Sequence, residues 1–176
     1  MSPPDRAPDS WSARLAERLA SFGYALGPVR RALPVRGPLI GSGSVRAQVR
    51  GMGGHWHEVW IDLPVFTPQQ WRRAEESLAP DLAEGRLPST PAALDAAFAR
   101  TGLSLLPATA RDLTLECSCP DRSTPCAHLT AVLLAVADEF DADPFTLLAL
   151  RGRDRDRLLT HSPAPAPPSP APAAEL

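Results

Sequence analysis

The 176-residue sequence predicts an α+β fold with a small antiparallel β-hairpin or sheet, several helices, a C-terminal strand-loop-helix unit and a disordered Pro/Ala-rich tail. Apolar and polar residues alternate along residues 45–50, and apolar residues share one face of residues 55–63, a period of two that is typical of half-buried strands. Three pairs of residues that commonly start helices, Thr67-Pro68, Thr90-Pro91 and Asp143-Pro144, stand outside this stretch. Residues 129–136 are apolar at almost every position, which predicts a helix packed on most of its faces.

The ends of the helices are marked by capping residues. A first helix is predicted over residues 11–21, because large apolar side chains recur there every four residues. A capping threonine, a proline in the first turn and a glutamine three residues after the cap predict a helix from residue 68 to about residue 79. Two further helices are expected to begin at residues 91 and 144, and Gly102 and Gly152 are expected to end them in the left-handed conformation.

The strands follow from the alternating pattern. Residues 45–50 form one strand, a glycine-rich turn at residues 51–54 reverses the chain, and residues 55–63 return beside it as a hairpin. Residues 35–40 are expected to form a further strand nearby. A last strand, residues 113–117, leads into the first cysteine of the chain.

All three cysteines and one of the four histidines fall within twelve positions, as Cys117, Cys119, Cys126 and His128. Three thiolates and an imidazole are the donors that tetrahedral zinc takes in closed structural sites, and this spacing lets one loop supply all four. Because four protein ligands leave no position for water, the metal is expected to hold the fold and to take no part in chemistry. It would join the end of a strand to the start of a helix running from Cys126 to about residue 140.

Other uses of these residues are weighed against zinc. A disulfide framework calls for an even number of cysteines and a secretory signal, whereas this chain has three cysteines and no apolar export segment. Cys126 and His128 could form a nucleophile pair, although a catalytic cysteine has no need of two further thiols. An iron-sulfur centre is compatible with the same ligand types. His55 and His57 lie on one strand face and could coordinate a second metal, but they are expected to be ordinary surface or edge residues, since no acid or thiol accompanies them on that face.

The two ligand pairs, Cys-x-Cys at 117–119 and Cys-x-His at 126–128 entering an apolar helix, resemble the SWIM zinc finger. This module is associated with Swi/Snf-type ATPases, transposases and recombination factors. Residues 102–107, 143–145 and 150–154 extend the resemblance to bacterial SWIM zinc finger proteins thought to be encoded near such ATPases. The likeness covers roughly residues 11–160. It implies bound Zn²⁺ and a role in DNA or protein binding, and it implies no known catalysis.

The sequence departs from that family at two places. Many members carry an aromatic residue between the ligand pairs and a lysine between the last cysteine and the histidine. This chain has Asp121-Arg122-Ser123 and Ala127 instead. These departures leave the metal ligands intact, but they argue against nucleic-acid contact by the finger itself.

Charge is divided unevenly along the chain, and all of its lysine-or-arginine positions are arginine. Residues 11–54 hold seven arginines against one acid, and residues 101–150 hold two arginines against seven acids. Since phosphate binding requires a local cationic surface, nucleic-acid contact is predicted on the N-terminal helix and hairpin. The predicted contact residues are Arg14, Arg18, Arg30, Arg31, Arg36, Arg46 and Arg50. The equally weighted alternative leaves these arginines solvated, stacked on Trp56 and Trp60, or paired with acids of the adjacent strand.

Composition also suggests how the chain is organised. Residues 1–9 and 161–176 are expected to be disordered, the tail because it is rich in proline, alanine and serine. Residues 10–107 are expected to form an α+β region with the basic helix and hairpin, and residues 108–160 the SWIM-type zinc finger and C-terminal helices. Three reduced cysteines and the lack of a long apolar run favour a cytoplasmic protein with no membrane contact.

Taken together, these patterns predict a non-enzymatic, zinc-binding accessory or adaptor protein without a small-molecule substrate. Its expected partner is a protein, a Swi/Snf-type ATPase or other DNA-processing machinery. The alternative is direct DNA binding through phosphate contacts from the arginine-rich N-terminal half.

Overall fold

The computed structural model describes residues 9–24, 26 and 33–160, and it confirms the α+β class. The predicted disordered ends therefore lie outside the described residues, except for Asp9. The strands are β1 (Val35–Gly41), β2 (Ser44–Arg50), β3 (Trp56–Asp62) and β4 (Thr114–Cys117). The helices are α1 (Trp11–Ser21), α2 (Pro68–Ala83), α3 (Pro91–Ala99), the 3-10 turn η1 (Ala110–Asp112), α4 (Ala127–Ala142), α5 (Pro144–Leu150) and α6 (Arg155–Thr160).

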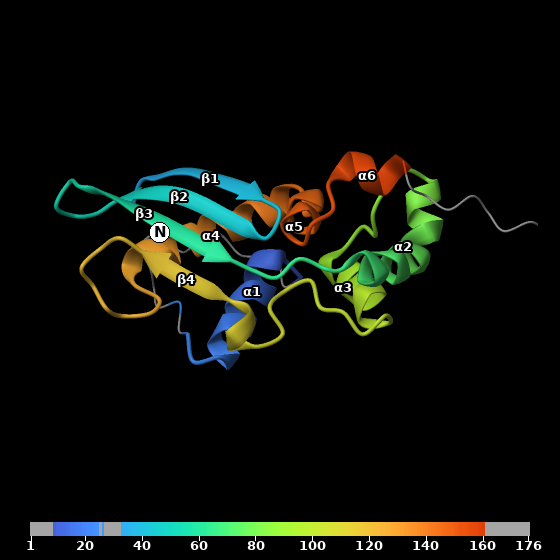
Figure 1. Cartoon of the computed structure of the whole chain (residues 1–176), viewed down its shortest axis with the longest axis horizontal. Coiled ribbons are helices and arrows are strands. Elements are labelled where there is room, and N and C mark those ends of the chain that lie inside the picture. The colour runs from blue at the N-terminus through green and yellow to red at the C-terminus, as the bar shows by residue number, and fades with distance from the viewer. Residues whose placement is uncertain (1–8, 25, 27–32, 161–176) are drawn as a thin grey trace, which may run out of the picture.

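The four strands form one antiparallel sheet in the order β1-β2-β3-β4. Their alternation gives the sheet two unlike faces, which we call the inner and the outer face. The inner face is apolar and buried, through residues such as Val45, Val49 and Val59. It is covered by helices, and α4 contacts every strand (Figure 1). The outer face carries the polar and charged residues of the same strands.

Helix α4 is the centre of the core, as its sequence predicts. Half of its residues are buried, and α1, α5 and the sheet pack against them, while Asp138, Glu139 and Asp141 near its C-terminal end are exposed. Each leucine or valine buried in this way stabilises the fold by roughly 1.5–3 kcal/mol. The core draws side chains from both regions that the sequence analysis separates at residue 107, and that division stays a prediction.

A second group of side chains lies at the opposite end of the molecule from the β2–β3 turn, around α2, α3 and α6 (Figure 1). We call it the aromatic end. The rings of Phe66, Trp71 and Phe98 lie 5.5 to 5.9 Å apart. The buried guanidinium of Arg151 lies over Phe66 and donates to the carbonyls of Pro64 and Ser104, both at 2.6 Å. This arginine therefore ties three loops together.

The predicted element ends are close to those observed, with two instructive differences. The helix expected to stop near residue 79 continues to Ala83 through Pro80. Leu78 and Leu82 are buried one turn apart on either side of this proline, so packing carries the helix past the missing hydrogen bond. The finger helix begins at Ala127, because Cys126 is its N-cap and not its first residue. Within the described ranges, no helix is both long and apolar enough to cross a membrane.

Candidate metal centre

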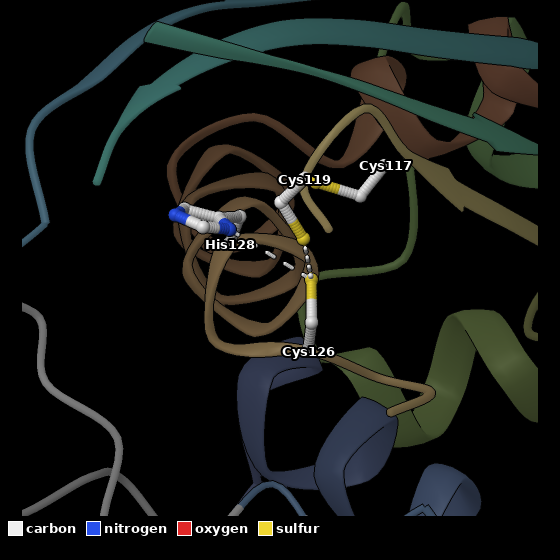
Figure 2. A group of neighbouring side chains, drawn as sticks. All are labelled: Cys117, Cys119, Cys126 and His128. Atoms are coloured by element: carbon white, nitrogen blue, oxygen red, sulfur yellow. Dashed lines mark hydrogen bonds between the residues drawn. The ribbon is translucent and has the colours of Figure 1, made fainter. Parts of the chain in front are cut away.

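The four predicted ligands converge on one point at the junction of β4 and α4. One donor atom from each of Cys117, Cys119, Cys126 and His128 lies within 4.8 Å of the other three. The Sγ atoms of Cys119 and Cys126 are 3.6 Å apart, and Cys126 Sγ lies 3.9 Å from Nδ1 of His128 (Figure 2). With Zn–S bonds of about 2.3 Å, sulfurs around a tetrahedral zinc lie about 3.8 Å apart. The donor set and its spacing are therefore consistent with Zn²⁺.

The first two cysteines are held by strand β3. Cys117 is the last residue of β4 and is paired with Val59. Beyond the strand, the N–H of Ser118 donates to the carbonyl of Glu58, and the N–H of Glu58 donates to the Ser118 hydroxyl, both at 2.9 Å. This reciprocal pair continues the ladder past Cys117 and sets the direction in which the chain turns toward Cys119.

The other two ligands belong to the start of α4. The sulfur of Cys126 accepts the N–H of Leu129 at 3.5 Å as the N-cap of the helix, and Thr130 donates its hydroxyl to the Cys126 carbonyl at 2.9 Å. His128 is the second residue of the helix. Free N–H groups at a helix N-terminus favour negative charge, so this position suits a thiolate. Cys126 is buried, whereas the other ligands are partly accessible.

The ionisation of these groups explains why a cation is needed. Burial, together with the neighbouring thiols, raises the pKa of Cys117 to about 12, and burial also raises the pKa of Cys126. Neither thiol would ionise near neutral pH without a positive charge in the site, and a metal ion supplies that charge. Burial lowers the pKa of His128, with a smaller contribution from His57, and so favours the neutral imidazole that binds metals.

The His128 ring has two distinct sides. Nδ1 is the nitrogen that faces Cys126 Sγ, and Nε2 points away from the sulfurs (Figure 2). On that far side the ring meets His57 of β3, with the two ring centroids 4.4 Å apart. The expectation that His57 is an ordinary surface or edge residue is therefore wrong: it is half-buried against a metal ligand. His57 lies two residues before Val59 and four before Ile61 in the same strand, so the alternation of the strand places it with them on the inner face. This spacing is the feature of the sequence that could have predicted its position.

The structure separates those predicted nucleic-acid-binding arginines that it describes into two groups. Arg36, Arg46 and Arg50 are exposed on the outer face of the sheet. Arg36 lies over the Trp56 ring at 4.0 Å, and Arg46 stands opposite Trp60 in the ladder. This agrees with the stacking alternative for Arg36.

The α1 arginines lie on the other side of the sheet, because Leu15 of α1 borders the same small internal cavity as inner-face residues of β2 and β3. Arg14 is paired with Asp9 at 2.9 Å and with Asp95 at 3.2 Å. Arg18 is on the same helix, and Arg30 and Arg31 lie outside the described residues. The described arginines therefore do not form one stripe, and nucleic-acid contact stays a prediction.

Comparison with known proteins gives two matches. Residues 102–137 match the SWIM zinc finger family, a segment that contains all four converging ligands. The chain is also similar to the uncharacterized protein Rv2102 of Mycobacterium tuberculosis, with 38% identity over 155 residues. That alignment covers 82% of this chain and 55% of the relative, so the chain spans about half of the relative's length. No solved structure matches the chain.

Proposed function

We propose that this protein, whose residues 102–137 form a SWIM zinc finger, is a non-catalytic adaptor that docks on a DNA-processing machine of the Swi/Snf ATPase type. The observation that carries the proposal is the closed donor set. Three sulfurs and one imidazole nitrogen lie within 4.8 Å of one another, so protein atoms alone can complete a tetrahedral zinc site. Such a site stabilises structure and leaves no position for a substrate.

The surroundings of Cys126 support a role without catalysis. This thiol is only 2% exposed and already accepts the N–H of Leu129, so a substrate could not reach it without opening the helix start. In the zinc-loaded chain all three cysteines are ligands, and coordination makes their sulfurs less reactive as nucleophiles. We expect one zinc per chain and no alkylation by iodoacetamide at neutral pH. Rapid alkylation of Cys126 in the zinc-loaded chain would instead indicate an enzyme.

We assign the partner to a groove on the outer face of the sheet. The groove encloses about 450 Å³, and its lining includes Arg36, Leu39, Arg46 and Trp60. Leu39 is 74% exposed, which is unusual for a leucine in a strand, and two arginines flank it. Apolar surface beside guanidinium groups fits a partner segment with acidic and apolar side chains.

The adaptor proposal is tested with the purified, zinc-loaded chain and a Swi/Snf-type ATPase of the same organism. We expect a complex by calorimetry, and we expect the Leu39→Asp and Arg46→Glu variants each to weaken it at least tenfold, because central interface residues contribute more than about 1 kcal/mol. Arg157→Glu, at an exposed position on α6, is the matched control. Absence of binding, or equal binding by all variants, would rule out this docking surface.

Direct DNA binding is the second candidate, and one observation favours it. Arg36, Arg46 and Arg50 share the outer face with Trp56 and Trp60, a combination that can hold phosphates beside stacked bases. Three phosphate contacts predict that the logarithm of the affinity falls with the logarithm of salt concentration with a slope of about 2 to 3. Titration of labelled single-stranded and duplex DNA over a range of salt concentrations measures this slope. A flat or absent response favours the adaptor.

A further inference from the structure

The turn between β2 and β3 lies directly against the histidine of the metal centre. His57 is on the inner face of β3, paired with Val49 in the ladder, and its ring is tilted by 44° against the His128 ring at a centroid distance of 4.4 Å. His128 belongs to the SWIM segment at 102–137, whereas His57 lies outside that segment. The contact therefore joins the finger to a part of the chain about seventy residues earlier.

Gly51 closes the same contact from the side. A Cβ atom at this position would lie 2.9 Å from Nε2 of His128, closer than real Cβ atoms approach, and in a tight contact of 3.2 Å with Nε2 of His57. Gly51 is not among the glycines with positive φ, so its backbone conformation does not require glycine. The requirement comes from the space that the two imidazoles occupy. The backbone of Gly51 is itself fixed, because its N–H donates to the His55 carbonyl at 2.9 Å.

We propose that Gly51 and His57 form a cradle that holds the His128 ring with Nδ1 toward the three sulfurs, and that both are positioning residues of the metal centre. A neutral imidazole that binds a metal through Nδ1 carries its proton on Nε2. The group that packs against the Nε2 side must therefore be uncharged or anionic and must match the shape of the ring. The cradle supplies a neighbour of that shape. Zinc affinity is then higher when the His128 side chain already has its metal-binding orientation before the metal binds.

Strand β3 thereby organises both halves of the ligand set. Glu58 fixes the turn between Cys117 and Cys119 through its two backbone hydrogen bonds with Ser118, and the preceding residue, His57, packs on His128. Adjacent residues of one strand thus orient ligands that come from β4 and from α4. This inference rests on the zinc centre alone and is independent of the partner proposed above.

The first test compares histidine variants of the 176-residue chain. We expect His57→Ala to weaken zinc binding about 10- to 100-fold, measured by competition with a chromophoric chelator, as is common when a neighbour that orients a metal ligand is removed. His57→Phe keeps an aromatic ring in the contact and should bind zinc within about threefold of the unmodified chain. His55→Ala is the matched control, since His55 is exposed on the same turn.

Cobalt spectra separate positioning from a general loss of stability. Co²⁺ takes the same tetrahedral ligands, and its visible bands report ligand identity and geometry. The spectrum of His57→Ala should shift toward that of His128→Ala, whereas the spectrum of His57→Phe should match the unmodified chain. If His57→Ala matched the unmodified chain in both spectrum and zinc affinity, the cradle would have no role in positioning.

The second test uses two glycines of the same turn. Gly51→Ala places a methyl group against the His128 ring and should weaken zinc binding at least tenfold. Gly53→Ala is the matched control, because its Cβ would meet only His55 at an ordinary 3.7 Å and its φ is not positive either. Helicity at saturating zinc shows whether each variant folds. Equal zinc affinities for the two folded variants would contradict the proposal.

Discussion

The metal centre and the aromatic end are held together by different means. At the aromatic end, three rings pack on one another, and the buried Arg151 satisfies two loop carbonyls without any ligand. At the metal centre, one half-buried and one buried thiol converge with pKa values raised by burial, and only a cation makes their ionised forms favourable. The first region depends on side chains alone, whereas the second depends on an ion. The comparison predicts that the two regions respond differently to the same perturbations.

Removal of zinc is the perturbation with the largest expected effect. Structural zinc stabilises zinc-finger peptides by about 10–16 kcal/mol near neutral pH, which is as large as the free energy of unfolding of a whole domain. After chelation, amide hydrogen exchange should accelerate most in β4, the ligand loop and the first turns of α4. Amides of α2 and α3 should remain protected. Equal acceleration at both ends would show that the two regions unfold as one unit.

The pH dependence of zinc affinity sharpens the same contrast. Cys117 and Cys126 are protonated in the metal-free chain at neutral pH, because burial raises the pKa of both thiols. Zinc binding must release these protons, so the affinity rises with pH and falls as pH is lowered. Each released thiol proton corresponds to about a tenfold change in Kd per pH unit, so Cys117 and Cys126 together contribute about a hundredfold. Chelator competition between pH 6 and 8 measures this slope, and a slope near zero would mean that the thiols are already ionised without metal.

Loss of the Arg151 side chain should affect only the other region. Arg151→Met keeps the apolar stem but leaves the Pro64 and Ser104 carbonyls without their donor. We expect the free energy of unfolding to fall by about 2–4 kcal/mol, measured in denaturant, because unsatisfied buried groups are costly. Zinc affinity should not change. Arg157→Met, at an exposed position of α6, is the control, and a similar loss in that variant would contradict the role of Arg151.

Local signals in the sequence predicted the parts of both regions that depend on local chemistry. The Thr67–Gln70 capping box is present as predicted, with both of its hydrogen bonds formed. Gly102 and Gly152 have positive φ values of 75° and 100°, as expected for residues that follow helix ends. The four metal ligands converge as predicted, because they lie within twelve residues of one another on a strand, a loop and the start of a helix. In each case residues close in sequence meet one another.

Contacts between distant parts of the chain could not be predicted in the same way. The packing of His57 on His128 and the clearance at Gly51 arise only once the sheet register brings the β2–β3 turn beside α4. Likewise, residues 150–154 stand out by resemblance, but no local pattern shows that Arg151 reaches Pro64 and Ser104. The seven arginines look like one basic region because they are near in sequence. The sheet places the two on α1 on the opposite side from the three on the strands.

The smallest expected effect comes from removing one side-chain hydrogen bond at each end. Ser118→Ala loses the bond that its hydroxyl accepts from Glu58, and Thr67→Ala loses the bond that its hydroxyl accepts from Gln70. Both variants should lower the free energy of unfolding by about 1 kcal/mol, a typical value for one such bond or cap. Only Ser118→Ala should also weaken zinc binding, by a few fold, because Ser118 directs the turn between two ligands. If Thr67→Ala weakened zinc binding equally, the folding of the two regions would be coupled. Zinc would then stabilise the whole chain and not only the end that contains the metal centre.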